Sequence, residues 1–338
     1  MRQGVLRGGW SRSLGLLVAV AGLLAATWAS IVLGVNAISL GDVLDAVSGA
    51  PVTDAERIVY HLRIPRTATG LLAGTALGVA GAAMQGLTRN PLADPGLLGI
   101  NAGAALAVVV AINILGLSGV SEYLWFAFGG AAVAAVFVYA LGSLGLGGAT
   151  PVKLALAGAA TTAFLGGITT MITLRDASLM DDFRFWAVGS LTRADGAALL
   201  TVAPFVGVGL VLAVGLSRTL NALALGDDLA RSLGTRLWAA RAVGAVAVVL
   251  LAGGATAVAG PVAFIGLVVP HVARMICGPD YRWVMAWTAV LAPTLLLVAD
   301  VIGRLVAQPQ QLQVGIVVAA AGAPFFLYLV RHRKLVEV

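Results

Sequence analysis

Two pairs of charged residues have the type and spacing to form defined ionic contacts. Arg63 and Arg66 lie three residues apart, so both face one side of a helix if the helical turn continues there. Asp300 lies four residues before Arg304, the spacing of an i,i+4 ion pair. Guanidinium groups bind carboxylates through paired hydrogen bonds, which suits these arginines to acidic partners. We interpret Asp300 as a structural partner that orients Arg304, and the alternative is a proton-relaying acid within a membrane bundle.

Residues for nucleotide hydrolysis or metal binding lack the required spacing. Only Lys153 and Lys334 occur as lysines, and neither follows a glycine, so the chain has no phosphate-binding loop. The three histidines are scattered, and the single cysteine excludes an internal disulfide or a multi-cysteine metal cluster. We therefore expect a chain that is no enzyme and binds no metal or other cofactor itself.

The composition of the 338 residues is that of an integral membrane protein. Apolar residues make up 60% of the chain, charged residues only 11%, and the mean hydropathy is +0.99. At roughly 20 residues per crossing, the apolar residues fill about ten helices and leave no room for a separate catalytic module. The basic residues are spread singly, which argues against nucleic-acid binding. We expect one all-α transmembrane domain over residues 1–338.

Uncharged stretches place the helices along the chain. The stretch 242–273 is too long for one comfortable helix, and Gly260 with Pro261 divides it into two segments. About ten crossings result, counted from stretches 13–41, 67–88, 95–121, 123–152, 154–174, 196–217, 242–273, 283–299 and 305–330.

The distribution of basic residues orients these crossings. With ten spans, 14 of the Lys and Arg residues fall on the cytoplasmic side and 7 on the outer side, and both termini are cytoplasmic. We read the first apolar run as a retained helix, because it is longer than the apolar core of a signal peptide.

A cytoplasmic segment at 217–240 contains a short amphipathic helix. Leu225, Leu229 and Leu233 recur at helical spacing, Asp227 lies on another face, and Gly234 ends the helix as a C-terminal cap. A helix lying on the lipid surface is one alternative. The small apolar stripe beside acidic residues fits a protein groove better than anionic lipid.

Three motifs occur in order along the chain: Arg63 to Arg66, Leu87 to Ile100 and Gly260 to His271. Within the second motif, Asp94 is placed to cap the helix that follows. Together these motifs resemble the FecCD-type permeases, the membrane subunits of ABC importers for ferric siderophores, haem and vitamin B12. The resemblance extends from about Leu33 to Arg331 and is closest to permease subunits of the ferric-enterobactin type.

The resemblance implies a type II ABC importer permease of the bacterial cell membrane. Such a subunit pairs with a second permease subunit, and a heterodimer is favoured over a homodimer. An ATPase dimer that uses ATP and Mg, together with an extracytoplasmic substrate-binding protein, completes the transporter. The implied function is import of a ferric siderophore, and haem or vitamin B12 are the alternatives. A proton-coupled carrier, or a membrane receptor without transport, is a less favoured reading.

The resemblance also assigns roles to particular residues. The segment 217–240 corresponds to the coupling helix that docks in the ATPase, with contacts from Gly226, Ala230, Leu233 and Gly234. Arg63, Arg66 and Arg304 correspond to arginines that receive glutamates of the binding protein, and the alternative is that they are solvated surface charges.

Polar residues on glycine-rich spans are candidates for lining the translocation path. They serve equally well as polar contacts between helices. These residues are Met84, Gln85, Asn101, Thr161, Thr162, Thr169 and Thr170.

Overall fold

The described part of the chain is all helical. The structure, a computed structural model, describes residues 4–6, 8–34, 38–49, 51–117, 119–145, 150–175, 183–184 and 186–332. The longer helices are α1 (Gly9–Val32), α4 (Ile64–Thr88), α5 (Ile100–Leu115), α6 (Val120–Ser143), α7 (Pro151–Thr173), α9 (Gly196–Gly215), α12 (Leu237–Val248), α14 (Ile265–Cys277), α15 (Tyr281–Val306) and α16 (Val314–His332). The shorter helices are α2 (Leu40–Ser48), α3 (Asp54–Ile58), α10 (Ser217–Leu223), α11 (Asp227–Ser232) and α13 (Gly254–Ala259), with π-helical turns η1 (Val59–Arg63) and η3 (Val249–Gly253) and the 3-10 turn η2 (Pro95–Leu98).

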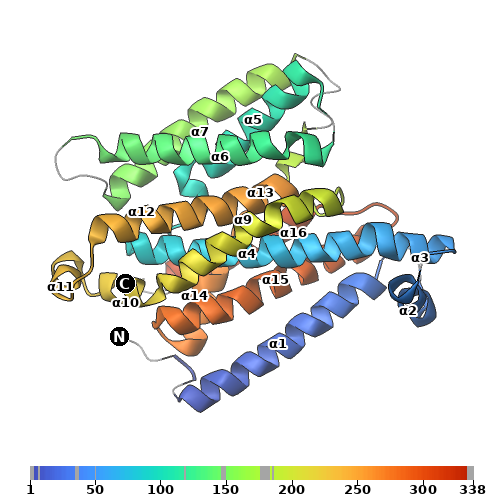
Figure 1. The fold of residues 1–338 in the computed structure, drawn as a ribbon, viewed down its shortest axis with the longest axis horizontal. Coiled ribbons are helices and arrows are strands. Elements are labelled where there is room, and N and C mark those ends of the chain that lie inside the picture. The colour runs from blue at the N-terminus through green and yellow to red at the C-terminus, as the bar shows by residue number, and fades with distance from the viewer. Residues whose placement is uncertain are drawn as a thin grey trace.

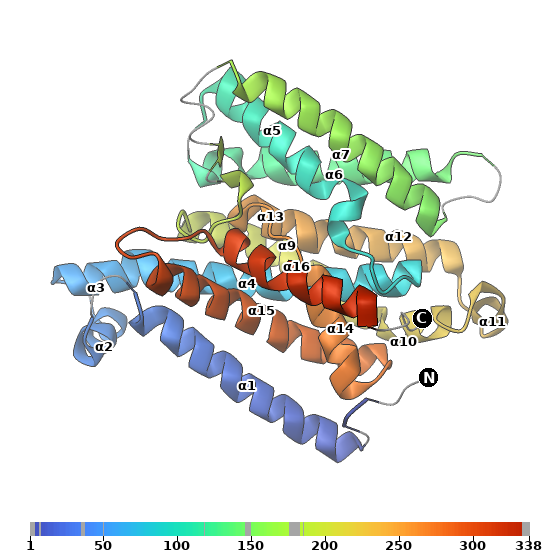
Figure 2. The ribbon, with the colours of Figure 1, turned by 180° about the vertical axis from the view of Figure 1, so that it is seen from behind.

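Helix α4 lies at the centre of a bundle of roughly parallel and antiparallel helices (Figure 1). It packs against α15, α14, α13, α9 and α12. Helices α5, α6 and α7 pack on one another and form a layer at one side, while α1 packs on α15 at the opposite edge (Figures 1 and 2). Most side chains of α4 are buried, whereas most of those of α1 and α7 are not. In a membrane protein such apolar outer helices face lipid or a partner.

The two ends of the bundle carry different short helices. Helices α10 and α11 lie at the end where α1 begins and α16 ends, and α2 and α3 lie at the other end (Figures 1 and 2). We call these the α11 end and the α2 end. The positive-inside distribution predicts that the α11 end is cytoplasmic.

Seven helical segments in the described residues are long and apolar enough to cross a membrane. They are Gly9–Val32, Asp54–Thr88, Val120–Ser143, Val152–Thr173, Gly196–Gly215, Leu237–Ala259 and Tyr281–Val306. Three shorter apolar helices accompany them, at Ile100–Leu115, Ile265–Cys277 and Val314–Tyr328. The all-helical membrane fold is thus confirmed, and the count of ten crossings with both termini cytoplasmic stays a prediction.

The helix that contains α4 begins before the uncharged stretch that predicts it. Thr53 accepts a hydrogen bond from the Glu56 N–H, and the Glu56 carboxylate accepts one from the Thr53 N–H, so the chain turns helical at Asp54. Helix continues through η1 into α4, which places Arg63 and Arg66 inside a helix. The uncharged stretch 67–88 therefore covers only the later part of this helix, and the helical turn continues through Arg63 and Arg66 as their spacing allows.

The long apolar stretch 242–273 breaks where its glycine and proline predict. Helix α13 ends at Ala259, Gly260 has φ +69°, and α14 begins at Ile265. This positive φ favours glycine, and Pro261 lacks the N–H that would continue the helix. The two-segment interpretation of this stretch is confirmed.

Close packing of α4 against α14 depends on glycine. A Cβ atom at Gly81 would collide with the backbone of Gly266. Small residues allow helix backbones to approach closely in membranes, where burial against lipid gives no comparable driving force. The glycine content therefore fixes how near α4 lies to its neighbours.

Candidate functional site

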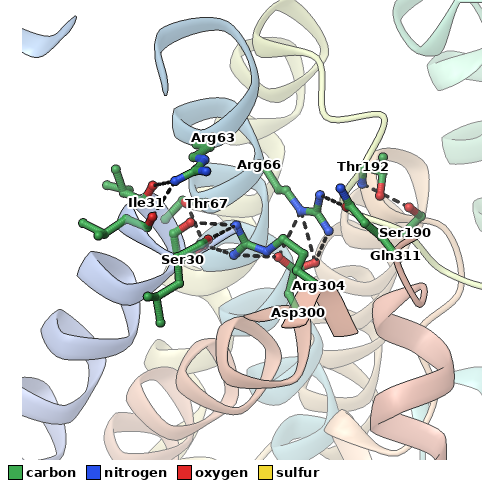
Figure 3. A network of polar contacts seen from close by, with 12 residues as sticks. Ser30, Ile31, Arg63, Arg66, Thr67, Ser190, Thr192, Asp300, Arg304 and Gln311 are labelled. Carbon is green, nitrogen blue, oxygen red and sulfur yellow. Dashed lines mark hydrogen bonds and ion pairs between the residues drawn. The ribbon is translucent and has the colours of Figure 1, made fainter. Parts of the chain in front are cut away.

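Arg63 and Arg304 cap the C-terminus of α1 at the α2 end. Nη1 of Arg63 donates to the Ile31 and Val32 carbonyl oxygens at 2.7 and 2.6 Å. Nη1 of Arg304 donates to the Ser30 and Leu33 carbonyl oxygens at 2.9 and 2.8 Å (Figure 3). The last carbonyls of a helix have no partner within the helix. Two guanidinium groups, one from α15 and one from η1, thus satisfy the end of α1.

Asp300 joins two of the arginines. Its carboxylate accepts hydrogen bonds from Nη2 and Nε of Arg66 at 2.7 and 3.0 Å, and it lies 3.2 Å from Nη2 of Arg304. Arg66 also donates from Nη1 to Gln311 at 2.7 Å (Figure 3). The predicted i,i+4 pair of Asp300 with Arg304 is confirmed. The bidentate pair with Arg66 links α4 to α15, since these residues lie 234 positions apart in the sequence.

The arginine cluster, which we define as Arg63, Arg66, Asp300 and Arg304, is buried within the chain. Its three arginines are only 6%, 8% and 3% exposed, and Asp300 is fully buried. They are therefore not the solvated surface charges that the sequence left as an alternative. Three guanidinium groups and one carboxylate leave the cluster with an excess of two positive charges, which attracts an acidic group approaching the α2 end.

The segment 217–240 contains two short helices, α10 and α11, and the first residues of α12, whereas the sequence predicts one short helix there. Helix α10 ends at Leu223, and α11 begins after Gly226, whose φ of +104° and ψ of 156° are tolerated only by glycine. Gly234, with φ +84°, follows the last turn, and the N–H groups of Gly234 and Thr235 donate to Arg231 and Ala230. This is the capping arrangement predicted for Gly234.

Leucines in α11 and on either side of it are exposed, whereas an alanine of the helix is buried. Leu225, Leu229 and Leu233 are 48%, 53% and 64% exposed, whereas Ala230 is fully buried. The six-residue helix is too short to be stable alone, so its packing on the bundle must hold it in place. The exposed leucines at the α11 end form an apolar surface of the kind that a protein groove covers.

The loop after α4 is fixed by its own polar side chains. Asp94 accepts a hydrogen bond from the Gly96 N–H at 2.8 Å and caps η2, so the predicted cap is confirmed on a 3-10 turn. Burial raises the pKa of the Asp94 carboxyl above its ordinary value, and the Gly96 hydrogen bond opposes this shift. The loop thus holds the start of α5 at a defined position.

Asn101 lines a cavity of about 600 Å³. Its Oδ1 accepts a hydrogen bond from Thr256 at 3.1 Å. The remaining lining is apolar and mostly small: Ala187, Val188, Pro261, Ala263, Gly315, Ile316, Ala319 and Ala320. Of the candidate path residues, Asn101 is the one that lines this cavity.

The other candidate path residues do not gather around the Asn101 cavity. Met84 and Gln85 are buried near the end of α4, where Gln85 donates to the Gly266 and Leu267 carbonyls and accepts from Arg274. On α7, Thr161 and Thr169 are buried, and Thr162 and Thr170 are exposed. Gln85 therefore acts as a polar contact between α4 and α14, the alternative that the sequence had left open.

Several contacts at these sites were missed by sequence reasoning. Ser30 joins the arginine cluster by accepting from Arg304 at 3.1 Å and lies 2.8 Å from the Thr67 hydroxyl. Asp227 pairs with Arg89 and Arg241. The pair Arg241 and Asp227 is 14 residues apart and crosses a turn, so no helical spacing signals it. For Ser30 and Thr67, the available signal in the sequence was a polar side chain within a long apolar stretch.

Comparison with protein families finds one that covers most of the chain. Residues 22–332 match the model of the FecCD transport family. The ferric enterobactin transport system permease protein FepD of Escherichia coli K12 is 46% identical, covering 94% of this chain and 96% of that protein. The iron(3+)-hydroxamate import system permease protein FhuB of Bacillus subtilis is 42% identical over 96% of this chain and 85% of its own length.

Two further matches come from a haem system and from a solved structure. The hemin transport system permease protein HmuU of Yersinia pestis is 36% identical over 82% of this chain and 84% of that protein. A solved ABC transporter chain in an inward-facing conformation superposes with a TM-score of 0.78 at 24% identity, covering 94% of this chain and 99% of that one. This similarity shows that the chain has the same fold as that transporter chain.

Proposed function

This chain belongs to the FecCD transport family, and we propose that it is the membrane permease subunit of an ABC importer that carries a ferric siderophore into the cytoplasm. It is a multi-pass protein of the bacterial cytoplasmic membrane. The proposed substrate class is supported by the 46% identity to the ferric enterobactin permease over almost the full length of both chains. Haem and vitamin B12 remain the alternative cargoes within the same family.

Energy for transport comes from a partner in this proposal. The sequence contains no phosphate-binding loop, so ATP and Mg are used by an ATPase dimer. The exposed leucines in and beside α11 form the surface to which this dimer binds. Leu233 is the anchor, and Gly226, Ala230 and Gly234 allow close approach. ATP binding in the partner then drives the bundle between outward-facing and inward-facing states.

The remaining subunits surround the path and the outer mouth. A second permease subunit, preferentially a related and not identical chain, faces the cavity at Asn101, where small side chains leave room for a bulky chelate. A substrate-binding protein docks at the α2 end, attracted by the excess positive charge of the arginine cluster. Membrane lipid covers the exposed apolar faces.

A proton-coupled carrier is the rival mechanism. Asp300 would have to exchange a proton with water during transport. In this chain Asp300 is fully buried, and its carboxylate is bound by two guanidinium groups. These contacts support the structural role of Asp300.

Uptake by the purified transporter tests the proposed function. The complex is isolated from its native membranes through a tag on this chain and reconstituted in liposomes with its binding protein. We expect uptake of an iron-55 catecholate chelate that requires ATP and stops when the ATPase is inhibited with vanadate. Hydroxamate and citrate chelates, haemin and cobalamin are compared in parallel. Uptake that continues without ATP contradicts the proposal. A preference for haemin or cobalamin would show that the cargo is haem or vitamin B12 and not a ferric siderophore.

Replacing Arg63 tests docking at the arginine cluster. In Arg63→Gln the cluster loses one of its two excess positive charges, and we expect the binding protein to bind about tenfold more weakly because the attraction of an acidic partner to the α2 end falls. Binding to the transporter in nanodiscs is measured at several salt concentrations. Arg63→Lys keeps the charge and should retain most of the affinity.

Arg57→Gln is the matched control for Arg63→Gln. Arg57 lies six residues earlier at the same end, is exposed, and pairs only loosely with Asp54 at 3.7 Å. It should leave the affinity unchanged. An unfolding temperature close to wild type shows that the α1 cap survives in Arg63→Gln. Equal affinity in Arg63→Gln and wild type would remove Arg63 from the docking surface.

A further inference from the structure

Asp227, the first residue of α11, connects three parts of the chain through one carboxylate. Its Oδ1 lies 3.3 Å from Nη2 of Arg89, the residue that follows α4. Its Oδ2 accepts a hydrogen bond from Nη2 of Arg241 in α12 at 2.8 Å. All three side chains are partly buried. A single carboxylate therefore ties α11 to the central helix and to α12.

The main-chain connections of α11 are glycine hinges. Gly226 precedes the helix with φ +104°, and Gly234 follows it with φ +84°. Glycine has the widest range of backbone conformations, so rotation at these two residues costs little. The backbone alone would let α11 pivot without moving α4 or α12.

Side-chain contacts of two kinds hold α11 on the bundle. Ala230 packs inward and is fully buried, and such a van der Waals contact resists compression but gives little resistance to separation. An ion pair resists movement in both directions, since the Coulomb energy rises as the charges part. Asp227 can thus transmit a pull as well as a push.

The Arg89 contact leads directly into the central, largely buried helix of the bundle. Helix α4 has 25 residues and spans about 37 Å at 1.5 Å per residue. Its far end carries Arg66 of the arginine cluster. Arg89 itself is a non-glycine residue in the left-handed region, with φ 51°, a conformation that persists only where its surroundings hold it. Movement of Asp227 therefore acts on the helix that reaches the opposite end of the molecule.

We propose that Asp227 is a positioning residue that transmits movement of α11 to α4 and α12 through Arg89 and Arg241. The inference rests on the proposed function, because it assumes that an ATPase moves α11. In addition, the force from the ATPase enters the bundle through the Asp227 carboxylate. Docking therefore uses the exposed leucines, and transmission uses Asp227.

Asp227→Asn in the complete transporter tests this assignment. The complex is purified from native membranes and reconstituted as before, and chelate uptake and ATP hydrolysis are measured on the same liposomes. We expect normal subunit stoichiometry, ATP hydrolysis within about twofold of wild type, and at least a fivefold fall in chelate transported per ATP, the lower end of typical coupling effects. Asp227→Glu should restore most of this ratio.

The partner arginine provides a second, independent readout. Arg241→Gln should lower the ratio in the same way, and the double variant with Asp227→Asn should be no worse than Asp227→Asn alone, because both remove one contact. Asp228→Asn is the matched control. Asp228 neighbours Asp227, has a fully exposed side chain and pairs with Arg231 on α11 itself, so the chelate transported per ATP in Asp228→Asn should equal that of wild type.

The outcomes separate this inference from the function on which it rests. ATP-dependent uptake by wild type together with an unchanged ratio in Asp227→Asn overturns the role of Asp227 and leaves the transporter assignment standing. Loss of the ATPase from the Asp227→Asn complex also overturns it, because Asp227 would then hold the partner and not transmit its movement. Wild-type uptake that needs no ATP overturns both.

Discussion

Replacing Leu233 with aspartate should abolish assembly with the ATPase and with it all ATP-dependent uptake. Leu233 ends α11, is 64% exposed at the α11 end, and is the anchor of the proposed docking surface. Burying a leucine in a partner groove contributes about 2 kcal/mol, and placing a carboxylate there costs at least about 2 kcal/mol. The combined effect of about 4 kcal/mol weakens the complex roughly a thousandfold. Co-purification of the ATPase with tagged permease measures it.

Leu233→Met is the matched control for this prediction. Methionine is similar in volume and apolar, so the complex should assemble at close to wild-type yield. Because the side chain at residue 233 points away from the bundle, both variants should be inserted and folded normally, as judged by the unfolding temperature of the isolated permease. A complete complex with Leu233→Asp would show that α11 does not dock through this residue.

Replacing Asp300 with asparagine should strongly destabilise the chain. Asp300 is the one carboxylate of the arginine cluster, is fully buried, and receives hydrogen bonds or ion pairs from Arg66 and Arg304. Asparagine leaves two buried guanidinium groups without their counter-charge, and removal of one partner from a buried ion pair costs about 3–5 kcal/mol in the free energy of unfolding. The unfolding temperature and the yield of monodisperse protein in detergent measure the effect.

The control for Asp300→Asn is Asp45→Asn. Asp45 lies on α2 at the same end of the bundle and is exposed, so its replacement should leave the unfolding temperature unchanged. The proton-relay reading predicts the opposite pattern for Asp300→Asn, namely a stable protein that has lost uptake. Normal stability with lost uptake would therefore revive that reading.

Features that depend on neighbouring residues were predicted from the sequence. The break at Gly260 with Pro261, the cap by Asp94 and the glycine that ends α11 all appear where the sequence predicts them. The pair of Asp300 with Arg304 also appears, since both lie within one turn of helix. Each of these depends on backbone geometry over a few residues, which local sequence specifies.

The start of the helix containing α4 and the placement of the arginines were not predicted. Charge within residues 57–66 was taken as the end of an apolar span, yet the chain is helical from Asp54. Burial of Arg63 becomes possible only because the α1 carbonyls lie within hydrogen-bonding distance, and those residues are about 30 positions away in the sequence. Hydropathy along the chain carries no information on such partners.

The sequence by itself therefore determined the kind of molecule: a helical membrane chain with one amphipathic segment at 217–240 and several charged residues that need partners. The tertiary structure alone decided which partners those are. Arg66 meets Asp300, Arg304 meets the end of α1, and Asp227 meets Arg89, in each case across a large gap in the sequence. The physical reason is that a buried charge is satisfied by whichever group packing brings within about 3 Å, and helix packing is set by small-residue contacts such as Gly81 with Gly266, which pair distant segments.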